Sequence, residues 1–136
     1  ALSYAGIAPR RAREDGRATT LRSRLRTHAG GDASRSTLRF TLGRLLAPQL
    51  GLRLNITRGS RLAFGAGERA LDAWMDENAR VVWHVTPEPW AIEPAVIRAL
   101  SLPLNVDHNQ HHPHAAIVAA MRRDARAAAR SAGTET

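Results

Sequence analysis

The sequence predicts one mixed domain of class α/β or α+β. A chain of 136 residues with 43% apolar content can bury one hydrophobic core but hardly two. Leucines recur at helical spacing between residues 36 and 46, which is typical of an amphipathic helix. Residues 81–85 read Val-Val-Trp-His-Val, and such a run of β-branched and aromatic side chains indicates a strand.

The expected elements follow one another in a simple order: the end of a strand at residues 2–7, an arginine-rich loop at 9–17, a helix capped by Thr19 or Thr20, a helix capped by Ser36, a hairpin within 52–67, a helix over 68–78, a strand over 81–85, a helix from Pro89 or Pro94 to Leu100, and a last helix over 115–131. Threonine and serine hydroxyls accept hydrogen bonds from the first turn of a helix, so they favour its start. The pair Gly30-Gly31 and the segment 48–51 end the first two helices, because glycine and proline interrupt helical backbone. The hairpin is predicted by weak alternation around a turn at 58–60.

Positive charge is concentrated in the N-terminal half of the chain. Residues 1–61 contain 13 Arg and three acidic residues, a local net charge of +10, whereas residues 62–115 have a net charge of −4 within a total of +8. Arginines that contact phosphates release counterions, so this half favours a polyanionic partner. We expect nucleic acid, and DNA rather than RNA, instead of a membrane. A solvated arginine-rich surface is the alternative.

Other classes of protein are excluded by composition. No stretch approaches the roughly 20 apolar residues that cross a bilayer, and no secretory signal pattern is present. Cysteine is absent, which excludes disulfides and thiolate metal sites. There is no nucleophile-elbow motif and no Walker-type phosphate loop. We expect a cytoplasmic protein, and its oligomeric state stays open.

Glu93 lies on a helix face that should be buried. It shares that face with Val96, Ile97 and Leu100, at spacings of three, four and seven residues. A carboxylate there should be paired or should bind a cation. If Pro94 is the first helical residue, Glu93 is instead the N-cap.

Arg24 breaks the pattern of the first helix in the same way. It shares a face with Leu21, Leu25 and His28. Its guanidinium either extends past the edge of the core into solvent or points into a site that binds an anion.

Together these positions form four motifs in a recognisable order: Tyr4-Ala5-Gly6, Leu21-Arg22-Ser23-Arg24-Leu25-Arg26-Thr27-His28, Glu93, and Pro103-Leu104-Asn105. In order and spacing they resemble the GIY-YIG nuclease family over about residues 1–109. The helix Ser-Thr-Leu-Arg-Phe-Thr-Leu-Gly at residues 36–43 is similar to one in small bacterial members.

The resemblance implies a small antiparallel sheet flanked by helices and a metal-dependent DNA endonuclease. Glu93 would hold one Mg²⁺ or Mn²⁺, and Arg24 would contact the scissile phosphate. Tyr4 would position or deprotonate the attacking water, His28 would assist proton transfer or cap its helix, and Asn105 would orient the site. Phosphodiester hydrolysis needs these groups: a cation, a base and a donor near the leaving oxygen. The arginines expected to contact nucleic acid are Arg10, Arg11, Arg13, Arg22, Arg26 and Arg39.

The chain also departs from the family pattern. The family's first strand should precede Tyr4, so we expect a fragment or a product that is truncated at this strand. Tyr4 and Arg24 are 20 positions apart, so an arginine-rich insertion enlarges the loop between their motifs, and residues 36–78 are an inserted helix-hairpin-helix segment. This division gives a nuclease domain at 1–109 and a C-terminal helical extension at 110–136.

A second group of potential ligands lies in a histidine cluster. His108, His111, His112 and His114 follow Asp107, and imidazoles bind Zn²⁺ or Ni²⁺. The cluster lacks the helical spacing that would direct two rings at one ion. We therefore expect a solvated or phosphate-facing loop.

Three functions remain open from the sequence. The first is a GIY-YIG-type endonuclease, and the second is a catalytically incomplete relative that binds nucleic acid without cutting it. The third is an arginine-rich interaction domain in which the likeness to the family is accidental.

Overall fold

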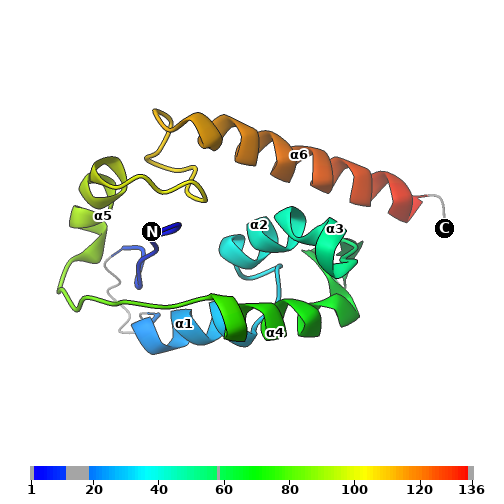
Figure 1. Cartoon of the computed structure of the whole chain (residues 1–136), viewed down its shortest axis with the longest axis horizontal. Coiled ribbons are helices and arrows are strands. Elements are labelled where there is room, and N and C mark those ends of the chain that lie inside the picture. Colours follow the sequence, from blue (N-terminus) through cyan, green and yellow to red (C-terminus); the bar gives the residue numbers. More distant parts are fainter. Residues whose placement is uncertain (1, 12–18, 58, 135–136) are drawn as a thin grey trace.

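The structure is a computed structural model that describes residues 2–11, 19–57 and 59–134. Its elements, shown in Figure 1, are α1 (Leu21–Gly30), α2 (Thr37–Leu45), α3 (Ala47–Leu50), β1 (Asn55–Ile56), β2 (Leu62–Ala63), a 3₁₀ turn (Gly65–Gly67), α4 (Glu68–Asn78), α5 (Pro89–Ala99) and α6 (Pro113–Thr134). Helices and a small antiparallel sheet occur together, which confirms the mixed class.

The helix starts follow the predicted caps. The Thr20 hydroxyl accepts a hydrogen bond from the backbone N–H of Ser23 at 3.1 Å. The Ser36 hydroxyl likewise accepts from the N–H of Arg39 at 3.1 Å. These bonds satisfy N–H groups that have no partner within their own helix. Local sequence therefore fixes where α1 and α2 begin.

One core lies between α2, the hairpin, α4 and α6. It includes Phe40, Leu52, Phe64, Leu71 and alanines of α6, all buried. A Cβ at Gly43 of α2 would lie 2.1 Å from the Phe64 ring, so only glycine allows this approach. The long helix α6 runs along one side of the molecule (Figure 1) and packs against α2 and β1. The C-terminal helix is thus part of the same core as the inserted segment.

The predicted hairpin is confirmed in a shorter form. β1 and β2 pair antiparallel, with Asn55 opposite Ala63 and Ile56 opposite Leu62. Ile56 also contacts α6, since a Cβ at Gly133 would lie 2.6 Å from its Cδ1 atom. The hairpin therefore joins the end of α6 to the core.

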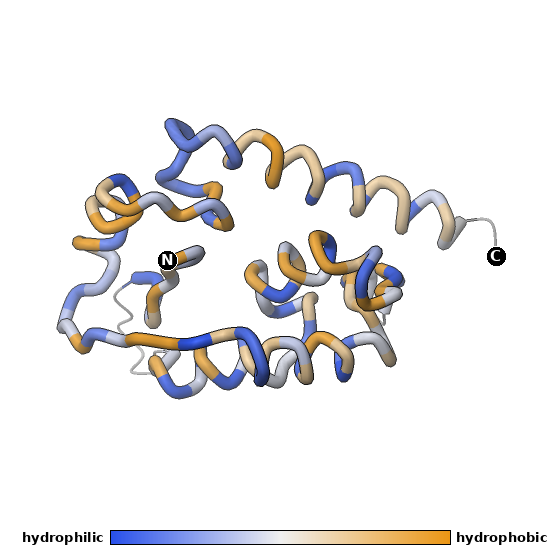
Figure 2. Tube along the Cα trace, in the orientation of Figure 1, coloured by the Kyte–Doolittle hydropathy of each residue, from blue (hydrophilic) through white to orange (hydrophobic). Residues whose placement is uncertain are grey.

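The two other predicted strands are wrong for the described residues. Residues 81–85 are extended without β pairing, and their side chains are exposed, with Val82 at 79% and Trp83 at 67%. Figure 2 shows this connection between α4 and α5 with hydrophobic and hydrophilic lengths in succession. Its side chains have the β-forming character of a strand, but a strand also needs a neighbour for its backbone groups. No described segment pairs with it.

Residues 2–7 also lack strand structure, although their backbone is held. The Ser3 carbonyl accepts from the N–H of Leu104 at 3.0 Å. The carbonyl and N–H of Ala5 both bond to the side chain of Asn105. The loop between α5 and α6, which contains Leu104 and Asn105, thus holds this segment where a paired strand would do so.

No helix among the described residues has the length and apolar composition that a membrane span requires.

Candidate active site

Tyr4 and His28 are brought together by the contact between the N-terminal segment and α1. Their rings meet edge to face, with centroids 5.9 Å apart. Tyr4 is half-buried and His28 is 8% exposed. A Cβ at Gly6 would lie 3.0 Å from the Tyr4 ring, so glycine leaves room for the ring to fold back over its own backbone.

His28 is fixed on its other side by α2. Its Nδ1 atom lies 2.6 Å from the hydroxyl oxygen of Ser36, the residue that caps α2. Its Nε2 atom is buried and has no hydrogen-bond partner among the described residues. Tyr4, His28 and Ser36 therefore form a continuous chain of contacts from the N-terminal segment to the start of α2.

The environment of His28 favours its neutral form. Burial lowers the pKa of His28 from 6.5 to about 4, and the positive charges of Arg24, Arg10 and Arg39 act in the same direction. A neutral imidazole has one ring nitrogen with a free lone pair. At neutral pH this ring is therefore uncharged, and its lowered pKa makes it a weak base.

We expect His28 to make the fold sensitive to acid. In the unfolded chain His28 binds a proton below pH 6.5, whereas the folded chain resists protonation until about pH 4. The unfolded state thus binds more protons in this window, so stability falls as the pH falls from 6.5 to 4. Urea unfolding should show a loss of about 2 to 3 kcal/mol from this group.

The variant His28→Gln should lack this part of the pH dependence, because it removes the titrating group. His84→Gln is the matched control, since His84 is exposed, and it should keep the wild-type pH dependence. Equal slopes for wild type and His28→Gln between pH 6.5 and 4 would show that His28 is not held neutral.

Arg24 borders a cavity rather than open solvent. It lines a cavity of about 200 Å³ together with Ile7, Pro9, Arg10, Arg11 and Thr19. Its Nε atom is buried and has no hydrogen-bond partner among the described residues. Three arginines around a small cavity, one with an unused donor, make a site suited to a phosphate, because the guanidinium fork matches phosphate oxygens.

Asn105 holds the backbone beside Tyr4. Its Oδ1 accepts from the N–H of Ala5 at 2.9 Å, and its Nδ2 donates to the carbonyl of Ala5 at 2.9 Å. Asn109, which is fully buried, donates to the carbonyls of Leu102 and Asn105 at 2.9 Å each. Two buried amides thus fix the segment that presents Tyr4.

Glu93 lies inside α5, not at its start. The N-cap is Glu88, Pro89 follows it in the first turn, and Pro94 lies within the helix. Glu93 is therefore not the N-cap, and the capping alternative is excluded. Its side chain is half-buried, and no hydrogen bond or ion pair involves it within the described part of the chain.

The residues present fit a single hard cation at Glu93. Mg²⁺ keeps several of its waters and is often bound by only one or two carboxylates. Glu93 has no competing partner among the described residues, so its oxygens are available to such an ion. No group of three or more His, Asp or Glu suited to a metal occurs in residues 2–11, 19–57 and 59–134, so α5 would supply this ligand alone.

Arg39 was expected to contact nucleic acid, and this prediction is wrong. Its side chain is fully buried and lies 2.6 Å from a Glu68 oxygen and 2.7 Å from an Asp72 oxygen. It also donates to the carbonyls of His28 and Ala29, at 3.2 and 3.1 Å. The guanidinium joins α4 to the end of α1 and has a structural role.

Of the other arginines expected to contact nucleic acid, four are exposed and one lies outside the described residues. Arg10, Arg11, Arg22 and Arg26 are exposed, and Arg10 and Arg11 line the cavity beside Arg24. Arg13 lies outside the described residues. The exposed positions agree with the expectation but do not test it.

Arg122 of α6 is a residue that sequence reasoning missed. Its Nε donates to the Thr41 hydroxyl at 2.8 Å, and its Nη2 donates to the carbonyl of Leu104 at 3.3 Å. Burial lowers the pKa of Arg122, as does Arg126, while Tyr4 and Asp107 oppose this. Arg122 thus lies close enough to Tyr4 to interact electrostatically with it.

A sequence signal for Arg122 was present. It lies four residues after Val118 and three before Ala125, and both are buried. The same pattern, a charge on a buried helix face, singled out Arg24 and Glu93.

The histidine cluster does not form a metal site in the structure. The His112 and His114 rings are in contact, with centroids 5.3 Å apart. His112 Nδ1 accepts from the N–H of His114 at 3.1 Å, and its Nε2 lies 3.2 Å from the Ser101 hydroxyl oxygen. The ring nitrogens of His112 thus make polar contacts at the loop that leads into α6. A loop at this position agrees with the sequence prediction.

The described residues thus place a neutral imidazole against a tyrosine ring, and Arg24 and Arg10, which act on that imidazole, line an adjacent cavity. A model of the GIY-YIG catalytic domain matches residues 1–127. The chain belongs to this family, which is a family of nucleases that act on nucleic acid. Neither the curated proteins nor the solved structures contain a match to it. The family match contradicts the alternative that the likeness is accidental.

Proposed function

We propose that this protein is a metal-dependent endonuclease that hydrolyses phosphodiester bonds in DNA. The observation that supports this most directly is the cavity of about 200 Å³ lined by Arg10, Arg11 and Arg24. It lies beside the Tyr4 and His28 pair, because Arg10 and Arg24 are close enough to His28 to lower its pKa. Charge stabilisation and proton transfer would therefore act at one place.

Each residue has a role that its surroundings support. Arg24 contacts the scissile phosphate through its guanidinium, at the cavity that it lines, and stabilises the charge that develops on the phosphate oxygens. Tyr4 positions or deprotonates the attacking water, and the neutral His28, whose ring contacts Tyr4, assists proton transfer. Asn105 holds Tyr4 in place through the backbone of Ala5. A Mg²⁺ or Mn²⁺ ion held by Glu93 would supply Lewis acidity at the phosphate.

A second candidate function, DNA binding without cleavage, is supported by a separate observation. The extended segment 81–85 that leads to α5 has no β partner among the described residues. No hydrogen bond or ion pair joins Glu93 to Tyr4, Arg24 or His28 within that part of the chain. A relative that binds DNA without cutting it would need the arginines but not this carboxylate.

The test is the nicking of supercoiled plasmid in the presence of Mg²⁺. Wild type should convert the plasmid to its nicked form. Arg24→Ala should lower the rate by about 10²-fold, because it removes the positive charge that stabilises the transition state at the scissile phosphate. Arg26→Ala is the matched control on the same helix. It should weaken DNA binding slightly while DNA that is bound is cut at the wild-type rate.

Two outcomes would contradict these assignments. If Arg24→Ala left both affinity and cleavage intact, Arg24 would not be in the site. If wild type bound DNA in a salt-dependent way but never nicked it, the second candidate would be correct.

A further inference from the structure

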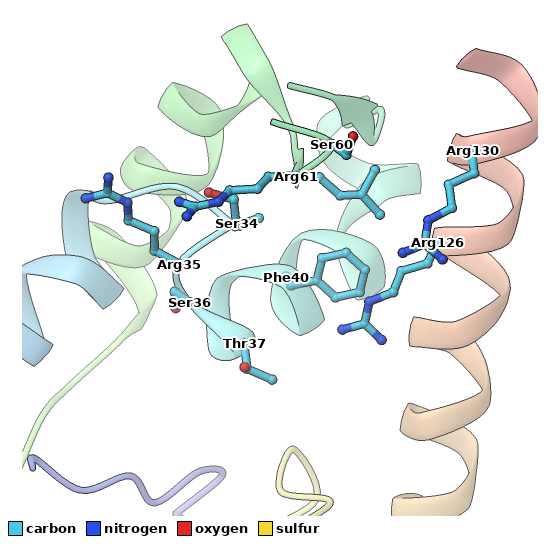
Figure 3. A pocket seen from close by; sticks show the side chains of 11 residues that line it. Ser34, Arg35, Ser36, Thr37, Phe40, Ser60, Arg61, Arg126 and Arg130 are labelled. Carbon is cyan, nitrogen blue, oxygen red and sulfur yellow. The ribbon is translucent and has the colours of Figure 1, made fainter. Parts of the chain in front are cut away.

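A second arginine-lined cavity lies between the start of α2, the hairpin and α6. It has a volume of about 280 Å³ and four arginines in its lining: Arg35, Arg61, Arg126 and Arg130. They come from three elements that are far apart in the sequence, as Figure 3 shows. None of the eleven lining residues is acidic. Folding thus concentrates positive charge at a place where no motif in the sequence predicted a site.

The guanidinium of Arg126 is fixed in position by the core. It lies over the Phe40 ring at 4.8 Å from the centroid, and Phe40 is buried. A cation held by the face of an aromatic ring keeps its in-plane N–H donors available to a ligand. Arg126 is therefore ordered before any ligand binds.

Two of the other cations, Arg35 and Arg61, lie on the wall opposite α6. Figure 3 shows the Arg61 side chain extending from the hairpin toward Ser34 and Arg35. No carboxylate lies within ion-pair distance of Arg35, Arg61 or Arg126 among the described residues. Like charges gathered in this way repel one another, and a bound anion would relieve that repulsion.

The carboxylate nearest in sequence is already engaged. Asp32 accepts hydrogen bonds from the hydroxyl and the backbone N–H of Ser34. These bonds, with a contribution from Arg35, hold the pKa of Asp32 below its ordinary value, although burial opposes them. Asp32 therefore interacts electrostatically with Arg35, one of the arginines of the cavity. It forms no ion pair with Arg35, Arg61 or Arg126.

The remaining lining suits phosphate oxygens. Thr37 and Ser60 also line the cavity, and serine, threonine and arginine are residue types that contact nucleic-acid phosphates. Thr37 is also the first residue of α2, whose first turn has no acidic residue, so the helix dipole adds to the positive potential.

We propose that this cavity binds a backbone phosphate of nucleic acid at a second position, separate from the phosphate that is cut. Ser36 connects the two places, because it lines this cavity and bonds to His28, which contacts Tyr4. A phosphate held here would fix the position of the strand relative to the site of cleavage. This inference rests on the proposed function as a DNA-binding nuclease.

The test compares two double variants that remove the same charge. Arg61→Gln with Arg126→Gln removes one cation from the hairpin wall and one from α6. Arg53→Gln with Arg123→Gln is the matched control, since both residues are exposed and lie just before β1 and on α6. Affinity for a short fluorescent DNA duplex is measured by anisotropy, without metal, over a series of salt concentrations. Circular dichroism melting confirms that wild type and both double variants are folded.

The cavity variant should weaken binding about ten-fold or more at 0.1 M salt and lower the slope of log K against log salt by about one to two. The control should retain a slope close to that of wild type. Equal losses in the two variants, or no loss in the cavity variant, would overturn the second phosphate site while wild type still bound DNA. If wild type failed to bind DNA at all, the proposed function would fail with it.

Discussion

Glu93→Gln is expected to abolish metal-dependent nicking while leaving DNA binding intact. The substitution keeps the shape of the side chain but removes the charge that would hold Mg²⁺ or Mn²⁺. A metal ion contributes several kcal/mol to transition-state stabilisation, so the rate should fall by about 10³-fold. Affinity should stay the same or rise slightly, because a negative charge is lost. Plasmid nicking and fluorescence anisotropy measure the two effects.

Glu88→Gln is the control for Glu93→Gln. Glu88 precedes the same helix, is exposed and makes no side-chain cap bond, so its loss should leave the rate of nicking unchanged. Nicking by Glu93→Gln at the wild-type rate would remove Glu93 from the site. A chelator should stop wild-type nicking, and nicking that persisted in its presence would contradict metal dependence.

Arg39→Met should destabilise the fold more than any substitution of an exposed arginine. Arg39 is fully buried between Glu68, whose side chain is 12% exposed, and Asp72. Removing one partner of a buried ion pair leaves the other charge without compensation and costs about 3 to 5 kcal/mol. The end of α1 also loses donors to two carbonyls. The midpoint of thermal unfolding should fall by about 10 °C or more.

Two further variants show whether the loss comes from the ion pair. Arg53→Met removes an exposed arginine and should change stability by no more than about 0.5 kcal/mol. Arg39→Met combined with Glu68→Met replaces both charged partners by apolar groups and should recover part of the loss. If Arg39→Met were as stable as Arg53→Met, Arg39 would not be the structural residue that the ion pairs indicate.

Arg24, Arg39 and Arg122 show why a role could not be assigned from sequence alone. Each lies on a helix face that also contains apolar residues. The structure places Arg24 beside a cavity with an unused donor, and Arg39 in an ion pair with α4. It places Arg122 against Thr41 and the Leu104 carbonyl. The pattern marks a buried charge, but the partner that gives the charge its role lies far away in the chain.

The sequence by itself determined most of the helices, the starts of α1 and α2, and the order of the motifs that define the family. Helical spacing and the caps at Thr20 and Ser36 depend on residues three or four positions apart, so a short stretch of chain contains all the information. Only the tertiary structure decided what depends on distant partners. It left 81–85 without a β partner among the described residues, buried Arg39 and gathered arginines of three elements around one cavity. Strand pairing and charge compensation are long-range interactions, and local sequence does not specify their partners.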